Sequence, residues 1–389
     1  GGGQQGDAMI LGVKRKVLNT RTNLSYTIVN GHRLSVNHTF KTVDRRDEDL
    51  LNPNVGNPLL STNDVKNGVY SFNYEVNEFD NKLTANVFYK IYQQSLNNTV
   101  YKVNTVDGQQ VVSKDVLKDS RINSGYGIAL SYQLLPKLYV LTSTERAVRM
   151  ADENEIFGNP EGNVLQNLAI NPEISDNFNA GFRIGTYTFD SHKLSFSANA
   201  FWRNMKDRIM PKANEQLNSQ DIEITQFVNL GKAQTLGFEG ELNYAFKDDL
   251  TVLVNFSKFN SLFKQEFDEA TGQKMTYYNK QIPNEPFFTV NANIHYRLHN
   301  ILQKKSQVNL FYTLGYVGSF RTIWPESDWF ITPEQYAQNI GLSYRFPNQK
   351  FLVSVDAKNI FNAELYDKFA VQKPGRAFYL KLNYTINKF

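Results

Sequence analysis

The segment that ends the chain constrains the fold more than any other feature of the sequence. Over residues 375–388 apolar and polar side chains alternate, and the chain then ends on an aromatic residue, Phe389. The apolar members of the alternation are Phe378, Leu380, Leu382, Tyr384 and Ile386. A period of two residues gives a strand one apolar face and one polar face. A long terminal strand of this kind favours an all-β, transmembrane antiparallel barrel, in which one face meets lipid and the other meets a polar lumen.

The same alternation recurs along the chain and predicts a series of long strands. We expect fifteen of them, at residues 17–29, 32–43, 68–79, 82–95, 121–134, 138–149, 173–188, 192–204, 233–246, 250–263, 286–299, 305–320, 335–346, 350–361 and 375–388. Short turns with Gly, Asn, Asp and Pro alternate with long polar segments. These long segments are predicted at residues 44–67, 96–120, 150–172, 205–232, 264–285, 321–334 and 362–374. Such an asymmetry is typical of bacterial outer-membrane barrels, whose long loops face the outside.

A β-propeller is the main competing fold, because the tight turns recur about every 50 residues and propeller blades repeat at about 40–50 residues. A blade, however, is built from four short strands. Each unit here offers two strands of about 12–14 residues, more than the roughly 9–11 tilted residues that span a bilayer. The strand lengths therefore favour the barrel.

The number of strands bears on how the domain is organised. Single-chain bacterial barrels have an even number of strands, and the last strand runs inward if Phe389 lies on the side of the short turns. Counting back through fifteen strands, the first strand also runs inward. We therefore expect residues 1–16 to be the tail of an external loop and residues 17–389 to be the C-terminal portion of a larger barrel. Residues 1–16 also lack the apolar core of about 7–15 residues of a secretory signal, so either a signal was removed or the chain continues upstream.

The composition argues against several other classes of protein. There is no Cys, and hence no disulfide framework and no Cys-ligated metal. The 42 basic and 38 acidic residues form no long single-sign run, which argues against a nucleic-acid partner. The five His are dispersed, and His295 and His299 would lie about 13 Å apart on a strand. Because the sequence also has no G-x-S-x-G, H-E-x-x-H or P-loop motif, we predict no enzymatic activity, no catalytic residues, no metal site and no cofactor.

Four ordered blocks of sequence resemble a known family. Residues 142–184 contain an Arg-bearing strand, an acidic loop and the segment NPEISDN, and further blocks lie at 227–244, 282–296 and 358–384. Together they resemble TonB-dependent outer-membrane receptors, and in style the Bacteroidetes type. The resemblance implies a barrel of about 22 strands with a plugged lumen. About fifteen of these strands lie in this chain, and the plug is expected to lie outside it.

The resemblance also implies a function. Receptors of this family import scarce nutrients too large for porins across the Gram-negative outer membrane, gated by TonB. We expect a ferric siderophore or related metal chelate as cargo, and as partners outer-membrane lipid, the TonB complex and the plug with the N-terminal part of the barrel. One alternative is a glycan or peptide importer with a surface lipoprotein, and another is a non-energised barrel scaffold in a larger outer-membrane complex. An outer-membrane enzyme is a third class, but no nucleophile and base can be nominated.

Aromatic and cationic side chains in the long segments are the candidates for ligand contact. They are Tyr277, Tyr278, Arg321, Trp324, Trp329 and Tyr336. Aromatic and Arg side chains provide rigid contact area and anion recognition. The alternative, which we favour for any single residue, is that they belong to the aromatic girdle at the membrane interface.

Two further groups of residues have mainly structural interpretations. The acidic residues Asp152, Glu153, Glu155 and Glu161 could attract a cation, but we expect them to lie in a solvated loop. Pro374, Gly375 and Arg376 precede the last strand, and together with Phe389 they resemble the C-terminal signature of a barrel read by the assembly machinery. We expect Gly375 to redirect the chain and Arg376 to pair with a lumen carboxylate.

Overall fold

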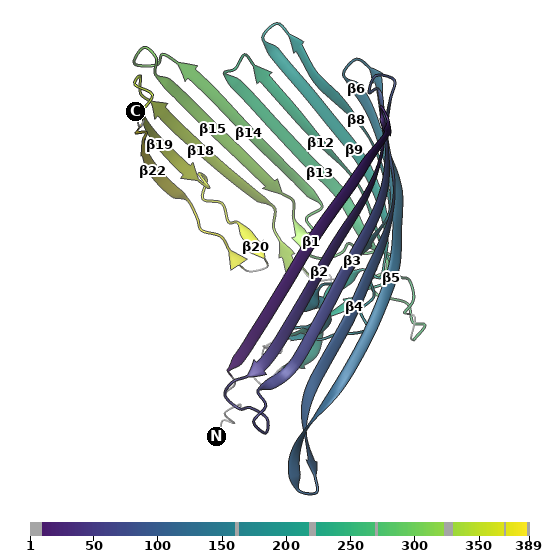
Figure 1. Ribbon diagram of the computed structural model, residues 1–389. Coiled ribbons are helices and arrows are strands. Elements are labelled where there is room, and N and C mark those ends of the chain that lie inside the picture. Colours follow the sequence, from purple (N-terminus) through teal and green to yellow (C-terminus); the bar gives the residue numbers. More distant parts are fainter. Residues whose placement is uncertain are drawn as a thin grey trace. The chain divides into compact units, whose positions relative to one another are not determined.

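The main element of the fold is an antiparallel sheet of fifteen strands that follow one another in sequence order, with β1 and β22 at its two edges (Figure 1). The computed structural model describes residues 10–159, 163–217, 223–268, 271–322, 330–368 and 371–386. The strands of this sheet are β1 (Leu11–Val29), β2 (His32–Asp49), β3 (Leu59–Glu78), β4 (Leu83–Val106), β5 (Gln109–Leu135), β6 (Leu138–Arg149), β8 (Glu173–Phe189), β9 (His192–Lys206), β12 (Ala233–Phe246), β13 (Leu250–Phe263), β14 (Phe288–His299), β15 (Gln307–Val317), β18 (Gln335–Arg345), β19 (Phe351–Lys358) and β22 (Ala377–Tyr384). All fifteen predicted strands are therefore confirmed, and in the predicted order.

Short elements occupy the long segments between these strands. They are α1 (Glu153–Phe157), β7 (Val164–Leu165), β10 (Ile209–Leu217), β11 (Glu223–Asn229), β16 (Phe320–Arg321), β17 (Ile331–Thr332), β20 (Tyr366–Lys368) and β21 (Val371–Gln372). Strands β10, β11 and β7 form a small sheet of their own. No helix among the described residues is long and apolar enough to cross a membrane.

Two of the predicted loops are wrong and one strand starts earlier than predicted, because the strands run further. Strand β1 begins at Leu11 rather than at 17, and the predicted loops 44–67 and 96–120 are largely the ends of β2–β5. Strands β4 and β5 are 24 and 27 residues long and meet at Asp107 and Gly108, whose φ angles are 49° and 78°. Two positive φ angles in an Asp-Gly pair make the two-residue turn that suits a tight hairpin. This dipeptide was the signal for a hairpin inside a segment rich in polar residues.

The cross-strand register shows which side chains share a face of the sheet. One row aligns Leu250, Tyr296, Leu310, Leu342, Val355 and Leu380 on consecutive strands from β13 to β22. A row on the opposite face aligns Arg297, Asn309, Ser343, Ser354 and Lys381. The first face is apolar but uncovered, and Leu380 is 69% exposed. A sheet face that is apolar and exposed on consecutive strands is typical of the lipid-facing side of a membrane β-barrel.

The chain divides into two compact units. The first comprises residues 1–130, 143–177 and 204–232, and the second comprises 131–142, 178–203 and 233–389. The first unit contains a buried apolar cluster made of Val65, Leu96, Ala151, Ile156, Phe157, Ile170 and Ile209. In the second unit Phe263 and Ile282 are fully buried. They are buried because the segment after β13 folds back on that strand, where the Ile282 amide donates a hydrogen bond to the Ser261 carbonyl at 2.8 Å.

Candidate functional site

The first unit carries a packed cover on the polar face of β3 and β4. Val65 and Leu96 are register partners on these strands, and the segment 150–172 packs on them through Ile156 and Ile170, which are both fully buried. Gln94, also fully buried, donates from Nε2 to the Ala151 carbonyl at 2.8 Å. The long segment after β6 is therefore a folded structure that closes over this part of the polar face.

A capping box starts the helix of this cover. The Asp152 side chain accepts from the Glu155 amide (3.1 Å), and the Glu155 side chain accepts from the Asp152 amide (2.9 Å). Glu153 and Glu155 are 8% and 9% exposed. The prediction that the acidic residues lie in a solvated loop was therefore wrong for these two, and Glu161 lies outside the described residues. The signal was the D-x-x-E spacing itself, which is the capping-box pattern.

Arg149 joins four elements at the edge of the cover. Its Nη1 donates to both carboxylate oxygens of Glu155 at 3.0 Å. Its Nε and Nη2 donate to Glu173 at 2.7 and 3.0 Å, and the Ile209 amide donates to the same carboxylate at 2.6 Å. The end of β6, helix α1, the start of β8 and the start of β10 are thus tied to one guanidinium group.

Arginines from three other strands hold the cover in place. Arg15 on β1 pairs with Glu153, with 2.7 Å between Nε and Oε1. Arg45 on β2 is buried, donates to the Gly158 carbonyl at 2.7 Å and is itself held by Asp47. Arg121 on β5 donates to the Leu168 carbonyl at 3.0 Å. Sequence reasoning missed these arginines, since each lies far along the chain from the group that it contacts.

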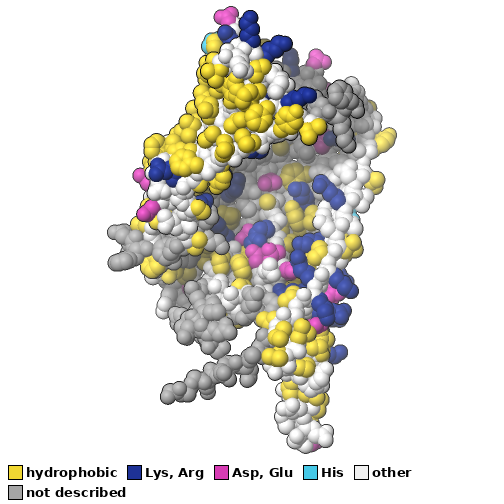
Figure 2. All heavy atoms as spheres, turned by 90° about the vertical axis from the view of Figure 1, so that its left-hand side faces the viewer, with side chains coloured by type: hydrophobic (Ala, Val, Ile, Leu, Met, Phe, Trp, Pro, Cys, Tyr) yellow, Lys and Arg dark blue, Asp and Glu magenta, His cyan; other side chains and the backbone are white. Residues whose placement is uncertain are grey.

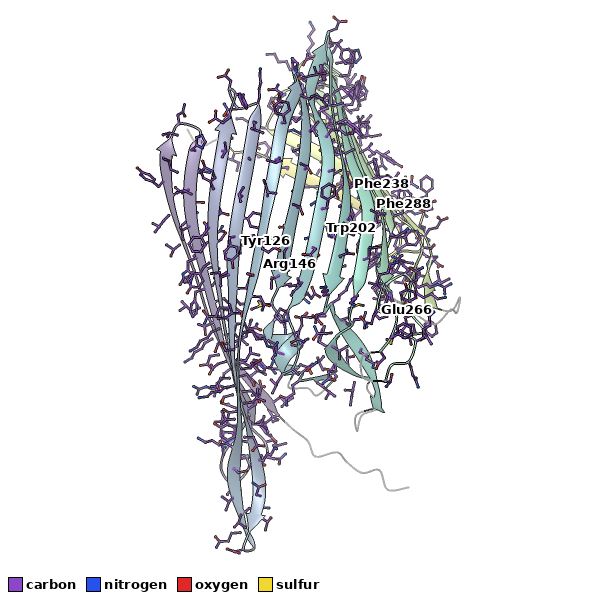
Figure 3. All side chains as sticks on the ribbon, turned by 90° about the vertical axis from the view of Figure 1, so that its right-hand side faces the viewer. Tyr126, Arg146, Trp202, Phe238, Glu266 and Phe288 are labelled. Atoms are coloured by element: carbon purple, nitrogen blue, oxygen red, sulfur yellow. The ribbon has the colours of Figure 1, made fainter. Side chains whose placement is uncertain are left out.

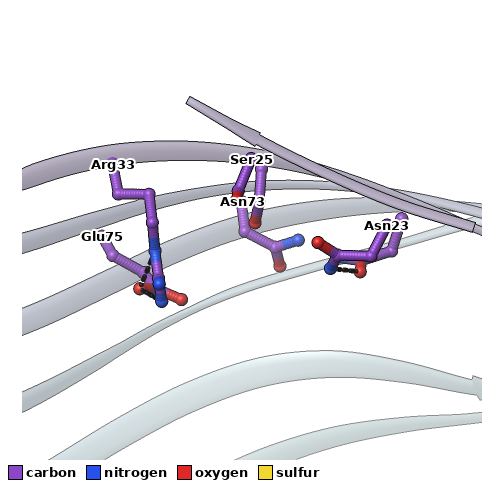
Figure 4. A pocket seen from close by; sticks show the side chains of 7 residues that line it. Asn23, Ser25, Arg33, Asn73 and Glu75 are labelled. Carbon is purple, nitrogen blue, oxygen red and sulfur yellow. Dashed lines mark hydrogen bonds and ion pairs between the residues drawn. The ribbon is translucent and has the colours of Figure 1, made fainter. Parts of the chain in front are cut away.

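The polar face of the first unit also has a small open hollow of about 220 Å³ on β1–β3 (Figure 4). Cross-strand pairs line it: Asn23 donates to Asn37, and Arg33 donates to Glu75 through Nε at 2.9 Å. In Figure 2 Lys, Arg, Asp and Glu side chains lie in the middle of the view, between patches of apolar side chains above and below. This surface offers hydrogen bonds and charges of both signs to a polar ligand.

The second unit has a larger hollow, of about 510 Å³, lined by residues of β8, β9, β12 and β13 among others. Two carboxylates, Glu239 and Glu241, are the charged groups in its wall, with Asn199, Asn255 and Ser257 beside them. No group of three or more His, Cys, Asp or Glu in the described part of the chain could hold a metal ion. The hollow therefore presents hydrogen-bonding groups beside the apolar side chains of Leu141, Phe182 and Phe256.

Exposed cations lie over aromatic rings on the polar face of the second unit. The Arg183 guanidinium lies 4.8 Å from the centre of the Tyr139 ring, and the Arg203 guanidinium lies 4.8 Å from that of Phe201. The Lys358 ammonium lies 5.4 Å from the centre of the Tyr379 ring. Such pairs can accept a planar or anionic ligand by stacking and charge together.

The structure brings some of the predicted ligand-contact residues together. Tyr277 and Tyr278 lie half-buried in a turn between β13 and β14, and Lys274 lies 5.7 Å over the Tyr278 ring. This segment meets that of Arg321, because the Asn284 amide donates to the Arg321 carbonyl at 2.8 Å. The two tyrosines and Arg321 therefore belong to joined segments at one end of the second unit.

The other predicted ligand-contact residues are placed differently. Trp324 and Trp329 lie outside the described residues. Tyr336 lies on the apolar face of β18, where it is the register partner of Tyr316 with 4.8 Å between ring centres. Tyr316 in turn contacts Phe288, which Figure 3 labels on the same face as Phe238. This row of aromatics is where a girdle at the membrane interface would lie.

The residues before the last strand dock on the turn after β19. The Arg376 amide donates to Asn362 Oδ1 at 2.9 Å, and its Nη1 donates to the Ile360 carbonyl at 3.4 Å. Arg376 thus contacts a backbone carbonyl where a lumen carboxylate was predicted. A Cβ at Gly375 would come within 2.7 Å of Asn362 Oδ1, so this glycine allows a close approach. Pro374 precedes this contact, and Phe389 lies outside the described residues.

One ionisable group in this segment is perturbed. Tyr366 on β20 donates its hydroxyl to Glu364 at 2.9 Å, and this hydrogen bond, followed by desolvation, raises the pKa of the tyrosine above its ordinary value. The same residue's amide donates to Gln335 Oε1 at 2.7 Å, which ties the segment to the start of β18. These contacts fix the segment locally and involve no reactive group.

Comparison with known proteins gives a consistent result. Residues 4–362 match the model of a family described as "TonB dependent receptor-like, beta-barrel". The copper transporter OprC superposes with a TM-score of 0.71 at 14% identity, over 98% of this chain and 58% of that chain. The Escherichia coli K12 ferric-catecholate import receptor Fiu superposes with a TM-score of 0.63 at 14% identity, over 96% and 55%. None of the curated proteins compared matches the sequence.

A third solved structure is also similar to this chain. The ferric preacinetobactin receptor BauA from Acinetobacter baumannii superposes with a TM-score of 0.65 at 11% identity, over 97% of this chain and 55% of that chain. At such identities the likeness concerns the fold alone. The chain spans a little over half the length of these structures.

Proposed function

The chain belongs to the TonB-dependent receptor β-barrel family, and we propose that it forms part of a receptor that imports a ferric siderophore or a related metal chelate. It is an outer-membrane β-barrel of a transporter family, not an enzyme. We infer that the TonB complex drives uptake and that the plug and the remaining strands of a barrel of about 22 strands come from elsewhere in the receptor. The edge strands β1 and β22 support this, since an open sheet edge does not occur within the bilayer.

The observation that carries the choice of ligand is the set of exposed cations over aromatic rings on the polar face. Arg183 over Tyr139 and Arg203 over Phe201 combine a positive charge with a flat apolar surface. Many metal chelates are anionic and contain planar groups, and a guanidinium on an aromatic ring contacts both features. The loop residues Tyr277, Tyr278, Arg321, Trp324 and Trp329 would supply the first contact outside. The sequence style further suggests a receptor of the Bacteroidetes type.

Binding by the full receptor tests the proposal. We would measure the affinity for a panel of ferric catecholate and hydroxamate chelates, for oligosaccharides and for peptides, with wild type and with Arg183→Ala/Arg203→Ala. A chelate should bind to wild type, and the double variant should bind it about tenfold more weakly. Lys305→Ala, an exposed lysine in a short turn, is the control and should bind normally.

Three results would contradict the proposal or part of it. Binding of an oligosaccharide or peptide with no chelate bound would support the alternative importer, whose surface lipoprotein partner should then copurify. Binding of none of these ligands, with no TonB-dependent uptake, would support a barrel scaffold within a larger outer-membrane complex. Equal chelate affinity of wild type and the double variant would show that these arginines do not contact the cargo.

A further inference from the structure

The apolar face of the first unit carries an ion pair that neither the fold nor ligand import explains. Arg146 on β6 donates to Asp176 on β8 through Nε (2.7 Å) and Nη2 (2.9 Å). The same guanidinium lies 5.8 Å from the centre of the Tyr126 ring on β5. Figure 3 shows Tyr126 and Arg146 next to each other on the surface of neighbouring strands.

The neighbouring glycines show which face this is. A Cβ at Gly125 would lie 3.2 Å from the Tyr92 ring, and a Cβ at Gly127 would lie 2.7 Å from the Phe88 ring. Phe88 and Tyr92 alternate with Tyr89 and Ile91, whose register partners are Phe72 and Tyr70 on the apolar face of β3. Gly125 and Gly127 therefore point to the polar face. Tyr126, which lies between the two glycines, points to the face that meets lipid.

The position along the strands places the ion pair near one limit of the apolar face. On β5 the large apolar residues Ile128, Leu130, Tyr132 and Leu134 follow Tyr126 on the same face and are exposed. In the other direction the residues with the same orientation are Ser124, Ile122, Ser120 and Lys118. The second group leads toward the long hairpin at Asp107, and away from the short turn after Leu135. Arg146 and Tyr126 thus lie where the lipid headgroups of the external leaflet begin.

The charges at this position leave one positive charge in excess. Lys206 at the end of β9 is exposed and close enough to Asp176 to act on it electrostatically, as Arg146 does. Two cations therefore face one carboxylate. Among the described residues Arg146 Nη1 makes no hydrogen bond, whereas Nε and Nη2 are occupied by Asp176. An N–H group fixed in direction and an exposed ammonium group are therefore placed to contact an anion.

We propose that Tyr126, Arg146 and Lys206 form a binding site for a phosphate group of an anionic lipid in the external leaflet, with Asp176 orienting the guanidinium. Arg and Lys together recognise a phosphate by a directed hydrogen bond and by charge. A tyrosine ring suits the depth at which headgroups meet acyl chains. Basic groups at this depth attract anionic headgroups. The site is independent of the transported ligand, and it does not rest on the proposed function.

Native mass spectrometry of the full receptor in neutral detergent tests the site. The probes are a bisphosphorylated disaccharide lipid, the same lipid without phosphates, phosphatidylcholine and inorganic phosphate. Wild type should retain the bisphosphorylated lipid in preference to the other three. Lys206→Ala, which leaves the ion pair intact, should bind it about tenfold more weakly, and so should Arg146→Ala/Asp176→Ala, which leaves no orphan charge.

The control is Lys247→Ala, which removes an exposed cation at a short turn beside Phe246. This variant should retain the lipid as wild type does. Heat modifiability in gels would confirm that each variant is folded, and the Lys206 variant remains decisive if the double variant fails to fold. Equal retention of phosphorylated and dephosphorylated lipid, unchanged retention by Lys206→Ala, or binding of inorganic phosphate without preference for the lipid would each overturn the proposal.

Discussion

Replacing Arg149 by Met should release the cover on the polar face of the first unit. The substitution keeps much of the side-chain length but removes the charge that Glu155 and Glu173 share, and these two side chains are 11% and 17% exposed. Removing one partner of a buried ion pair costs about 3–5 kcal/mol, whereas an exposed pair contributes about 0–1 kcal/mol. Because the Arg149 side chain is 44% exposed, we expect an intermediate loss of about 2–3 kcal/mol.

Hydrogen exchange measures this loss directly. The Asn167 amide donates to the Ile156 carbonyl at 2.7 Å, and the Gly158 amide donates to the Asn154 carbonyl at 3.0 Å. Both bonds lie within the cover, so their amides exchange when the structure of this segment opens. A loss of 2–3 kcal/mol should make exchange at these amides about 30- to 150-fold faster, while amides of β13 and β14 keep their protection.

A compensating variant makes the test specific. Arg149→Met combined with Glu155→Gln and Glu173→Gln removes the orphan charges and should restore much of the protection. Lys114→Ala, an exposed substitution on β5, should exchange as wild type does. Protection within threefold of wild type in Arg149→Met would refute the idea that this guanidinium holds the cover closed.

Three further substitutions test the packing and the two faces. Ile156→Ala empties a fully buried position and should cost about 2–5 kcal/mol, seen as faster proteolysis within residues 150–172; unchanged cleavage would contradict the packed cover. Gly127→Val should lower the yield of folded, heat-modifiable barrel, because a Cβ would lie 2.7 Å from the Phe88 ring, and Phe88→Ala should recover part of that yield. Leu382→Arg on the apolar face should cost up to about 2–4 kcal/mol in bilayer stability, whereas Asn383→Arg on the polar face should be tolerated; equal effects would show that the faces are assigned incorrectly.

The period of two residues was enough to predict the strands of the sheet. The alternation of apolar and polar side chains is contained in the sequence of each strand, and it decides which side chains lie on the apolar face and which on the polar face. Exceptions to that alternation were informative. Phe201 interrupts the pattern of β9, and in the structure it is 7% exposed on the polar face, where its ring lies 2.6 Å from the position of a Cβ at Gly237. A glycine on the next strand of the sheet makes room for the ring. A pairing of this kind requires the register between strands, which the sequence of one strand does not contain.

The packed cover could be predicted only in part, for a similar reason. The capping box of α1 is local and was visible in the spacing of Asp152 and Glu155. The contacts that hold the helix are not local: Arg15 and Glu153 are 138 positions apart, and Arg45 and Gly158 are 113 positions apart. Polar composition therefore suggested solvated loops, whereas long-range ion pairs and an apolar cluster fold the segment.

The hairpin of β4 and β5 has a practical consequence for work on intact cells. The pairing of β3 with β4 ends at Val100, so beyond it β4 has only β5 beside it, and the chain continues to the turn at Asp107 and Gly108. From Val100 to Val106 this two-stranded ribbon extends about 20 Å at roughly 3.3 Å per residue. At its tip a Cβ at Gly108 would meet nothing within 4 Å. A short epitope or fluorophore inserted there would report surface display and topology without touching either the cover or the polar face.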